Sequence, residues 1–209
     1  MAILKRGSRG AEVKALQQRL NLMPDGIFGP LTEEAVKEFQ KRKGLTADGI
    51  AGAQTLAAMG AIPGKRKVDE IILHYTATPE GEEFSNAQIK ASHLARGFSD
   101  IGYHYVIGLN GEIRPGRSEA VAGAHCTGHN TRSIGVCYVG GCPPRKTPNW
   151  QNIGKDTRTA AQEATLVKLV KELLKRYSGA TVHGHNEFAN KPCPGFDVKK
   201  WLTKVGIKQ

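Results

Sequence analysis

Apolar side chains in residues 1–62 recur at the three- and four-residue intervals that are typical of amphipathic helices. The positions that define two of these helices are Val13, Leu16, Leu20, Ala35, Val36 and Phe39. A third, shorter segment follows before the pattern stops. We therefore predict three short helices around a small core in this part of the chain.

One phrase occurs twice here, as DGIFGPLT at residues 25–32 and as DGIAGAQT at residues 48–55. Each copy predicts a glycine-containing turn that ends in a threonine. Thr32 is followed by two glutamates, and this arrangement suits an N-cap with acidic groups near the positive end of the helix dipole. We expect the helices to begin at these threonines.

The rest of the chain alternates strand patterns with amphipathic helices. Strands are predicted at residues 70–76, 102–108, 133–139 and 181–185, with a hairpin turn at Asn110-Gly111. Helices are predicted over residues 86–96, with Asn86 as the N-cap, and over a segment that includes residues 166–174. This order predicts an α/β fold: a mixed β-sheet flanked by helices, preceded by the small three-helix domain.

Residues 60–67 combine glycine, proline and a run of basic residues, a composition that is typical of a linker. We place the domain boundary there, with one domain over residues 1–62 and the other over residues 63–209. The first domain contains no cluster of acid, base or nucleophile, and this favours binding over catalysis.

Composition and charge restrict the class of protein. The chain is 39% hydrophobic and 23% charged, and it contains no apolar run of the roughly 20 residues that a membrane span needs. Its formal net charge of +11 favours contact with polyanions such as an anionic cell envelope. No basic stripe interleaved with aromatic residues is present, which argues against a specific nucleic-acid partner. We expect a monomer outside the membrane, and no export signal is visible at the start.

Candidate chemistry lies in two distant segments of the second domain. His74 ends the first predicted strand, while His185 and Cys193 are separated by seven residues near the end of the chain. Two imidazoles and one thiolate bind Zn²⁺ and leave one tetrahedral position open, as hydrolytic zinc sites require. Such an ion lowers the pKa of water toward roughly 7. Lys191 is then a cation that can stabilise the oxyanion formed by attack on a carbonyl.

The remaining histidines and cysteines have less specific signals. His93 and His104 lie within a helix pattern and a strand pattern, so we predict structural roles for both. His125 follows a short apolar segment and is a candidate substrate-binding residue. Cys137 lies in an apolar run and is predicted to be buried. We expect the cysteines that bind no metal to have been made as reduced thiols.

Two resemblances connect these motifs to known families. Residues 4–59, with GSRGAEVKALQQRLN and the repeated phrase, resemble the peptidoglycan-binding module of bacterial and phage wall hydrolases. Residues 71–201, with ILHYTAT, DIGYHYVI and HNEFANKPCPGFDVKKW, resemble type 2 N-acetylmuramoyl-L-alanine amidases, in particular the zinc amidase endolysins of short-tailed coliphages. The resemblance implies that His74, His185 and Cys193 bind zinc and that Tyr103 and Lys191 assist catalysis.

The sequence therefore predicts a phage or prophage endolysin that cleaves the amide between N-acetylmuramic acid and L-alanine in peptidoglycan. We expect it to be stored in the host cytoplasm and to act on the wall after release. Two alternatives remain. One is a binding-only peptidoglycan-recognition protein, which the presence of Cys193 disfavours, and the other is a cytosolic muropeptide-recycling amidase, which would not need the N-terminal module.

Overall fold

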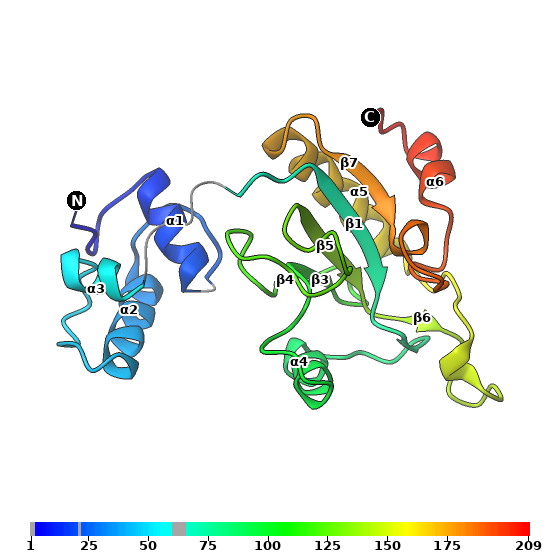
Figure 1. Cartoon of the computed structure of the whole chain (residues 1–209), viewed down its shortest axis with the longest axis horizontal. Helices are drawn as coiled ribbons and strands as arrows, with labels where there is room; N and C mark the ends of the chain where they lie inside the picture. The colour runs from blue at the N-terminus through cyan, green and yellow to red at the C-terminus, as the bar shows by residue number, and fades with distance from the viewer. Residues whose placement is uncertain (1–2, 21, 60–65) are drawn as a thin grey trace. The chain divides into compact units, whose positions relative to one another are not determined.

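The computed structural model describes residues 3–20, 22–59 and 66–209, and Figure 1 shows them as a ribbon. The chain forms two compact units, residues 1–65 and 66–209, which are described separately here. Residues 60–65, most of the predicted linker, lie outside the described residues. Among the described residues, no helix has both the length and the apolar character that crossing a membrane would require.

The N-terminal unit contains the three predicted helices. They are α1 (Ala11–Arg19), α2 (Pro30–Arg42) and α3 (Ala53–Ala58). Their buried apolar core is formed by Leu4, Val13, Leu16, Phe28, Val36 and Ala51. The helical periodicity of the sequence therefore identified part of the core, while Phe28 and Ala51 enter it from the two repeated turns.

A buried glutamine organises each of these turns. The Gln17 carboxamide donates to Asp25 (2.7 Å) and to the Thr32 hydroxyl (3.1 Å), and it accepts from the N–H of Gly26 (2.9 Å). The second copy repeats this network with Gln40, Asp48, Gly49 and Thr55. Each amide thus satisfies polar groups of its turn that would otherwise be buried without a partner.

The helices after the turns begin earlier than we predicted. The N-cap of α2 is Gly29, with Pro30 in the first helical turn, and the N-cap of α3 is Gly52. The prediction that Thr32 is an N-cap is therefore wrong, because its hydroxyl is bonded to Gln17. Proline suits a first-turn position since its missing N–H has no intrahelical acceptor there, so the helix starts two residues before the threonine.

The second unit is built on a five-stranded sheet in the order β4-β3-β5-β1-β7. Its strands are β1 (Glu70–Tyr75), β3 (Tyr105–Ile107), β4 (Ile113–Pro115), β5 (Ser133–Tyr138) and β7 (Thr181–Gly184). All pairings are parallel except β3 with β4, which form the hairpin that Asn110-Gly111 predicts. The mixed sheet confirms the predicted fold class. A separate parallel pair joins β2 (Thr78–Pro79) to β6 (Gly141–Cys142).

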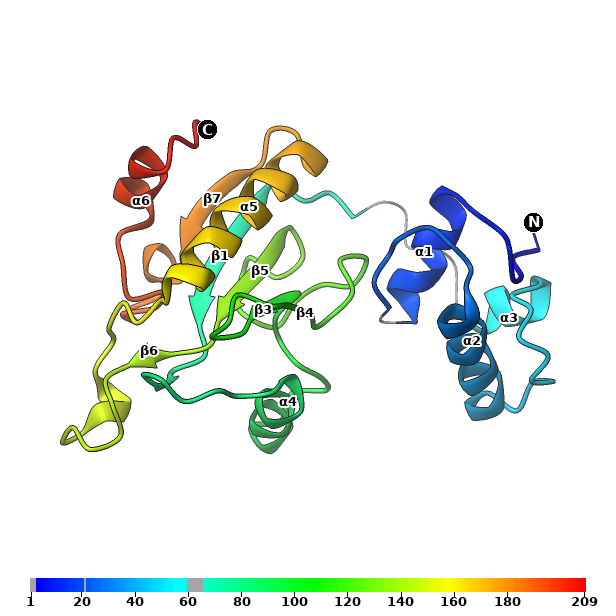
Figure 2. The same ribbon diagram turned by 180° about the vertical axis from the view of Figure 1, so that it is seen from behind.

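One face of the sheet is covered by α5 (Ala160–Arg176), as Figure 2 shows, and α6 (Val198–Lys204) packs into the same core. Alternate strand residues supply the sheet's share of this core, because successive side chains of a strand point to opposite faces. The strand residues on this face are Ile71, Leu73, Tyr75, Ile107, Ile134, Val136, Tyr138 and Val182. His74 therefore points to the opposite face.

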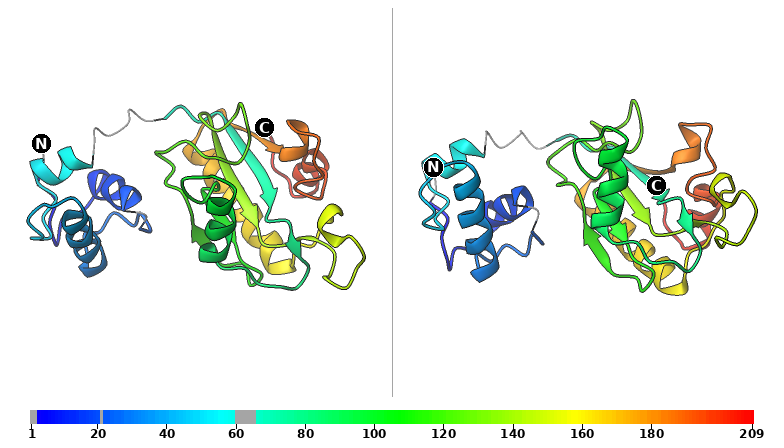
Figure 3. Two further views of the ribbon diagram at one scale, coloured as in Figure 1. Left: turned by 60° about the horizontal axis from the view of Figure 1, so that its bottom comes forward. Right: turned by 90° about the horizontal axis from the view of Figure 1, so that it is seen from below.

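That opposite face carries α4 (Asn86–Ala95), which lies on the other side of the sheet from α5 (Figure 3). Ile89 of α4 packs in a smaller cluster with Ile101, Val106 and Val139. The N-cap of α4 is Ser85, which forms a capping box with Gln88, so the prediction of Asn86 as the cap is wrong. Serine and glutamine at this spacing satisfy two backbone donors at once.

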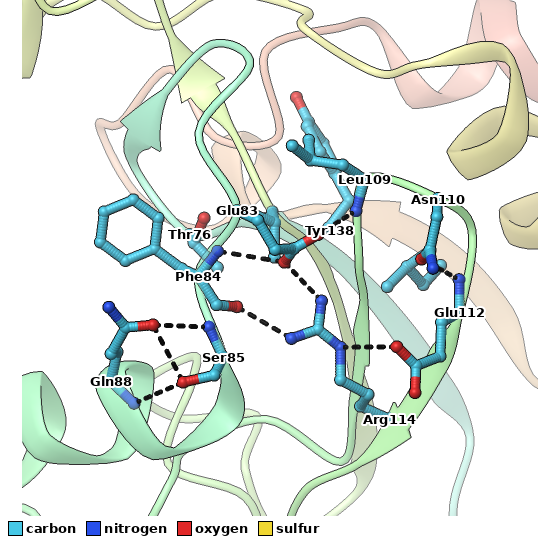
Figure 4. Close-up of polar contacts among 12 residues, drawn as sticks. Thr76, Glu83, Phe84, Ser85, Gln88, Leu109, Asn110, Glu112, Arg114 and Tyr138 are labelled. Carbon is cyan, nitrogen blue, oxygen red and sulfur yellow. Dashed lines mark hydrogen bonds and ion pairs between the residues drawn. The ribbon is translucent and has the colours of Figure 1, made fainter.

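The hairpin of β3 and β4 is fastened to the loop before α4 by Glu83 and Arg114 (Figure 4). Glu83 accepts from the N–H of Leu109 (2.7 Å) and from the Arg114 guanidinium (2.5 Å). Arg114 also donates to the carbonyl of Phe84 (2.9 Å) and lies directly against Gly108, where any side chain would collide with it. The edge of the sheet is thereby fixed in position relative to α4.

Candidate functional site

Two histidines meet where adjacent parallel strands end. In the register of β1 with β7, Leu73 pairs with Gly184, so His74 and His185 each follow one member of that pair. Their ring centroids are 4.6 Å apart. The carboxyl ends of parallel strands are the usual position of functional groups in α/β sheets. A single strand pairing therefore brings together two residues that are far apart in the sequence.

Cys193 reaches the same point from the loop after β7. The N–H of Asn186 donates to the Cys193 carbonyl (2.7 Å), which closes this loop. The Cys193 Sγ atom accepts from the N–H of Tyr75 (3.3 Å) and lies 3.7 Å from Nδ1 of His74. The ligand atoms of His74, His185 and Cys193 all lie within 4.8 Å of one another.

The donor set fits Zn²⁺. Two imidazole nitrogens and one sulfur are the ligand types that zinc selects, and three of them leave a fourth position open. Burial lowers the pKa of His74 well below its usual range and also lowers that of His185, with a further contribution from Lys191. Both imidazoles are therefore neutral near pH 7 and have a lone pair for a metal. Burial raises the pKa of Cys193 to about 12, so without a metal this group is a thiol.

The residues of this group differ in their exposure. His74 and Cys193 are 2% and 4% exposed, whereas His185 is half-buried and Lys191 is exposed. The Lys191 charge contributes to the lowered pKa of His185 and partly offsets the rise in that of Cys193, which indicates that it acts on the ligand group directly. A substrate carbonyl that approaches from the His185 side would meet this cation.

Tyr103 lies across the His74 ring. Their ring centroids are 5.3 Å apart, and the other side of Tyr103 faces His93 at 5.2 Å. Burial raises the pKa of the Tyr103 hydroxyl well above its usual range, so the residue is a neutral donor at any physiological pH. The segment 102–104 is not part of β3, contrary to the strand predicted over residues 102–108. The carbonyl of Tyr103 nevertheless accepts from the N–H of Arg117, so this segment still pairs with the residues that follow β4.

His125 lies behind His74. It is 8% exposed, and its Nδ1 atom is 3.0 Å from Nε2 of His74. Three further histidines have other hydrogen-bond partners. His93 accepts from the N–H of Gly102, and His104 accepts from the N–H of Gly135. His183 contacts the side chains of Thr181 and Glu187. His93 and His104 are buried, which confirms their predicted structural character, as does the complete burial of Cys137.

The loop of residues 149–159, for which the sequence predicts no role, supports the ligand segment. Gly154 lies so close to Pro192 that any side chain there would collide with it, and Gly195 lies equally close to the backbone of Lys155. The Tyr138 hydroxyl donates to the carbonyl of Pro194 (2.8 Å). Glycine in this loop is a sequence signal of close packing, but it does not identify the neighbouring residue.

Two family descriptions match the chain. The family described as N-acetylmuramoyl-L-alanine amidase matches residues 64–196, and the one described as a peptidoglycan binding domain matches residues 9–59. The first match contains His74, His185 and Cys193. The second contains both repeated turns of the N-terminal unit.

Individual relatives agree with these matches. The endolysin of Escherichia phage T7 is 37% identical over 142 residues, which cover 67% of this chain and 89% of the relative, and that of Enterobacteria phage T3 is 36% identical over 138 residues, covering 65% and 86%. The solved N-acetylmuramoyl-L-alanine amidase LysC from Clostridium intestinale has a TM-score of 0.57 at 26% identity, over 69% of this chain and 89% of that one. Drosophila PGRP-LB shares the fold, with a TM-score of 0.51 at 22% identity. The match covers 66% of this chain and 80% of PGRP-LB.

The protonation states of the ligand group lead to a prediction about pH. Binding of Zn²⁺ should release at least one proton at both pH 7.5 and pH 9.5, because Cys193, with a pKa of about 12, is still a thiol at both values. Affinity should accordingly rise with pH across this range. Calorimetric titration in buffers of different ionisation enthalpy measures the release. At pH 9.5 a water on the ion, with a pKa near roughly 7, would add about one proton, so the total release there should be about two. A thiol with an ordinary pKa of about 8.5 would contribute only about 0.1 proton at that pH, and a total of about one would contradict the prediction.

Proposed function

The chain belongs to the N-acetylmuramoyl-L-alanine amidase family, and from that premise we propose that it is a zinc-dependent phage or prophage endolysin. Its substrate is the amide between the lactyl group of N-acetylmuramic acid and L-alanine in peptidoglycan. The observation that carries the zinc assignment is the convergence of His74, His185 and Cys193 within 4.8 Å. The proposed localisation is the host cytoplasm after synthesis and the cell wall after release.

Each residue of the site has a defined task in this reaction. Zn²⁺ held by His74, His185 and Cys193 would supply Lewis acidity and lower the pKa of a water molecule. Lys191 provides a positive charge on the exposed side, where it stabilises the negative charge that develops on the carbonyl oxygen. Tyr103 keeps its proton, because burial raises its pKa, and its ring orients the reacting groups over His74.

The N-terminal unit holds the enzyme on its polymeric substrate. Its match to a peptidoglycan binding domain supports this role. Attachment to the wall raises the local concentration of scissile bonds around the second unit without any change in the chemistry. The basic charge of the chain adds a general attraction to an anionic envelope.

Two alternatives are less well supported. A binding-only recognition protein would have no need for Cys193, whose sulfur completes the ligand set. A cytosolic amidase for soluble muropeptides would have no need for the N-terminal match to a peptidoglycan binding domain. Neither alternative would degrade intact sacculi, so the following digestion separates both of them from a lytic amidase.

Purified peptidoglycan digested with this protein should yield peptides with free L-alanine amino termini and no new reducing sugars. Mass spectrometry of the products measures both. A chelator should stop the reaction, and added Zn²⁺ should restore it, because the reaction depends on the metal ion that the ligand group would hold. New reducing ends would indicate a glycosidase. Intact sacculi would indicate a binding protein if a soluble muropeptide is also left uncleaved, and a muropeptide-recycling amidase if the soluble substrate is cleaved.

Substitutions at the site should separate metal binding from turnover. Lys191→Ala should retain zinc and lose about 10²- to 10³-fold in kcat, because one stabilising group for the oxyanion is lost. Cys193→Ser should lose zinc and activity together, since a hydroxyl is a poor ligand in place of a thiolate. Metal content and kcat on a soluble muropeptide are measured for each variant. Lys204→Ala, which removes an exposed lysine of α6, is the control for loss of charge.

Removal of residues 1–62 should affect only the polymeric substrate. We expect binding to insoluble sacculi to fall by about tenfold or more, because attachment through the first unit is lost. Cleavage of a small muropeptide should stay within about twofold, since the ligand group lies in the second unit. Co-sedimentation and a soluble-substrate assay measure the two quantities. Equal losses in both assays would contradict the division of roles.

A further inference from the structure

His74 makes polar contacts through both of its ring nitrogens. Its Nδ1 atom faces Cys193, while its Nε2 atom is 3.0 Å from Nδ1 of His125. His125 in turn has its Nε2 atom 3.3 Å from the hydroxyl of Ser133. From this row of contacts we infer that Ser133 and His125 are positioning residues, which fix His74 in the tautomer whose Nδ1 lone pair is directed at the metal. This inference rests on the proposed zinc site.

The direction of each hydrogen bond in this row follows from the bond that Ser133 makes at the end away from His74. The Ser133 hydroxyl donates to the carbonyl oxygen of His129 (2.8 Å), and a carbonyl can only accept. A hydroxyl has one hydrogen, so toward His125 the Ser133 oxygen acts as the acceptor. Nε2 of His125 therefore carries a hydrogen.

The same reasoning continues to the metal ligand. His125 and His74 are 8% and 2% exposed, and burial without an anionic partner among the described residues favours the neutral imidazole, so each ring has one N–H. With its hydrogen on Nε2, His125 presents the lone pair of Nδ1 and accepts from Nε2–H of His74. The lone pair of His74 is then on Nδ1, on the side of Cys193. A hydrogen bond from the second nitrogen of a histidine ligand fixes its tautomer and orientation in metal sites generally.

The geometry around His125 shows that its ring has little freedom. Gly123 and Gly135 lie so close to the ring that any side chain at either position would collide with it. The backbone N–H of His125 also donates to the side chain of Asn130 (2.8 Å). Glycine on two sides of one ring indicates a close approach that holds the imidazole in a single orientation. This environment favours a positioning role over the substrate-binding role that we predicted for His125.

The experiment compares the full chain with four variants of it, each with a single substitution. Ser133→Ala removes the acceptor for His125 and changes little volume, and His125→Ala removes the acceptor for His74. His125→Asn retains an oxygen acceptor at the place of Nδ1 and serves as the conservative rescue. Thr165→Ala is the matched control, because its hydroxyl also donates to a carbonyl at 2.8 Å, that of Gly111, but it lies on α5.

Two measurements are made on each variant. ¹⁵N NMR of labelled histidines in the metal-free protein gives the tautomer of His74, and chelator competition gives the affinity for Zn²⁺. We expect the Nε2–H tautomer of His74 in the wild type, in His125→Asn and in Thr165→Ala. Ser133→Ala and His125→Ala should give a mixture of tautomers and an affinity for Zn²⁺ that is lower by about 10- to 100-fold.

The outcomes separate this inference from the proposed function. A wild-type protein that binds no Zn²⁺ would overturn the proposed zinc site, whatever the tautomer of His74. A wild type that binds Zn²⁺, together with a tautomer and an affinity that Ser133→Ala and His125→Ala leave unchanged, would overturn only the positioning role. An equal loss of affinity in Thr165→Ala would also overturn it, because the effect would then come from general destabilisation, which thermal unfolding monitors in parallel.

Discussion

The parallel pairing of β1 with β7 is the constraint on which the site depends. Hydrogen bonds between these strands fix Leu73 opposite Gly184, and the residue after each of them is one of the two histidines. A slip of one residue in this register would turn His74 toward the core under α5, because side chains alternate between the faces of a sheet. The apolar residues of β1 that pack against α5 prevent that slip. Packing on one face therefore determines the chemistry available on the other.

Much of this arrangement could be predicted from the sequence because its signals are local. A buried strand that ends in His74, and a histidine and a cysteine separated by seven residues, indicate the donor set without tertiary information. The errors occur where two local signals compete. Thr32 is a good N-cap residue, but Pro30 starts the helix earlier, and Ser85 caps the helix that we expected Asn86 to cap. In both cases the position of the N-cap depends on the hydrogen bonds of neighbouring side chains. The Thr32 hydroxyl is hydrogen-bonded to Gln17, and Ser85 forms a reciprocal pair with Gln88.

Other features had no local signal. Gly154 packs closely against Pro192, although the two residues lie in segments that are far apart in sequence. Neither segment has a periodic pattern of hydrophobic residues that would predict this contact. The position of His125 behind His74 also depends on chain folding, because residues 118–132 have no regular secondary structure. His125 is a candidate substrate-binding residue from the sequence, but only the structure shows that both its ring nitrogens face protein groups.

The tandem glutamine networks of the N-terminal unit have a consequence for how that unit can evolve. Gln17 and Gln40 each stabilise their own turn through an aspartate side chain and a backbone N–H, without using the side chains of Ile27 and Ile50. Ile27 and Ile50, which occupy equivalent places in the two copies, are 41% and 37% exposed. Mutations at such outward positions can accumulate in one copy while its backbone scaffold stays intact. A duplicated unit of this kind can diversify its recognition surface one turn at a time.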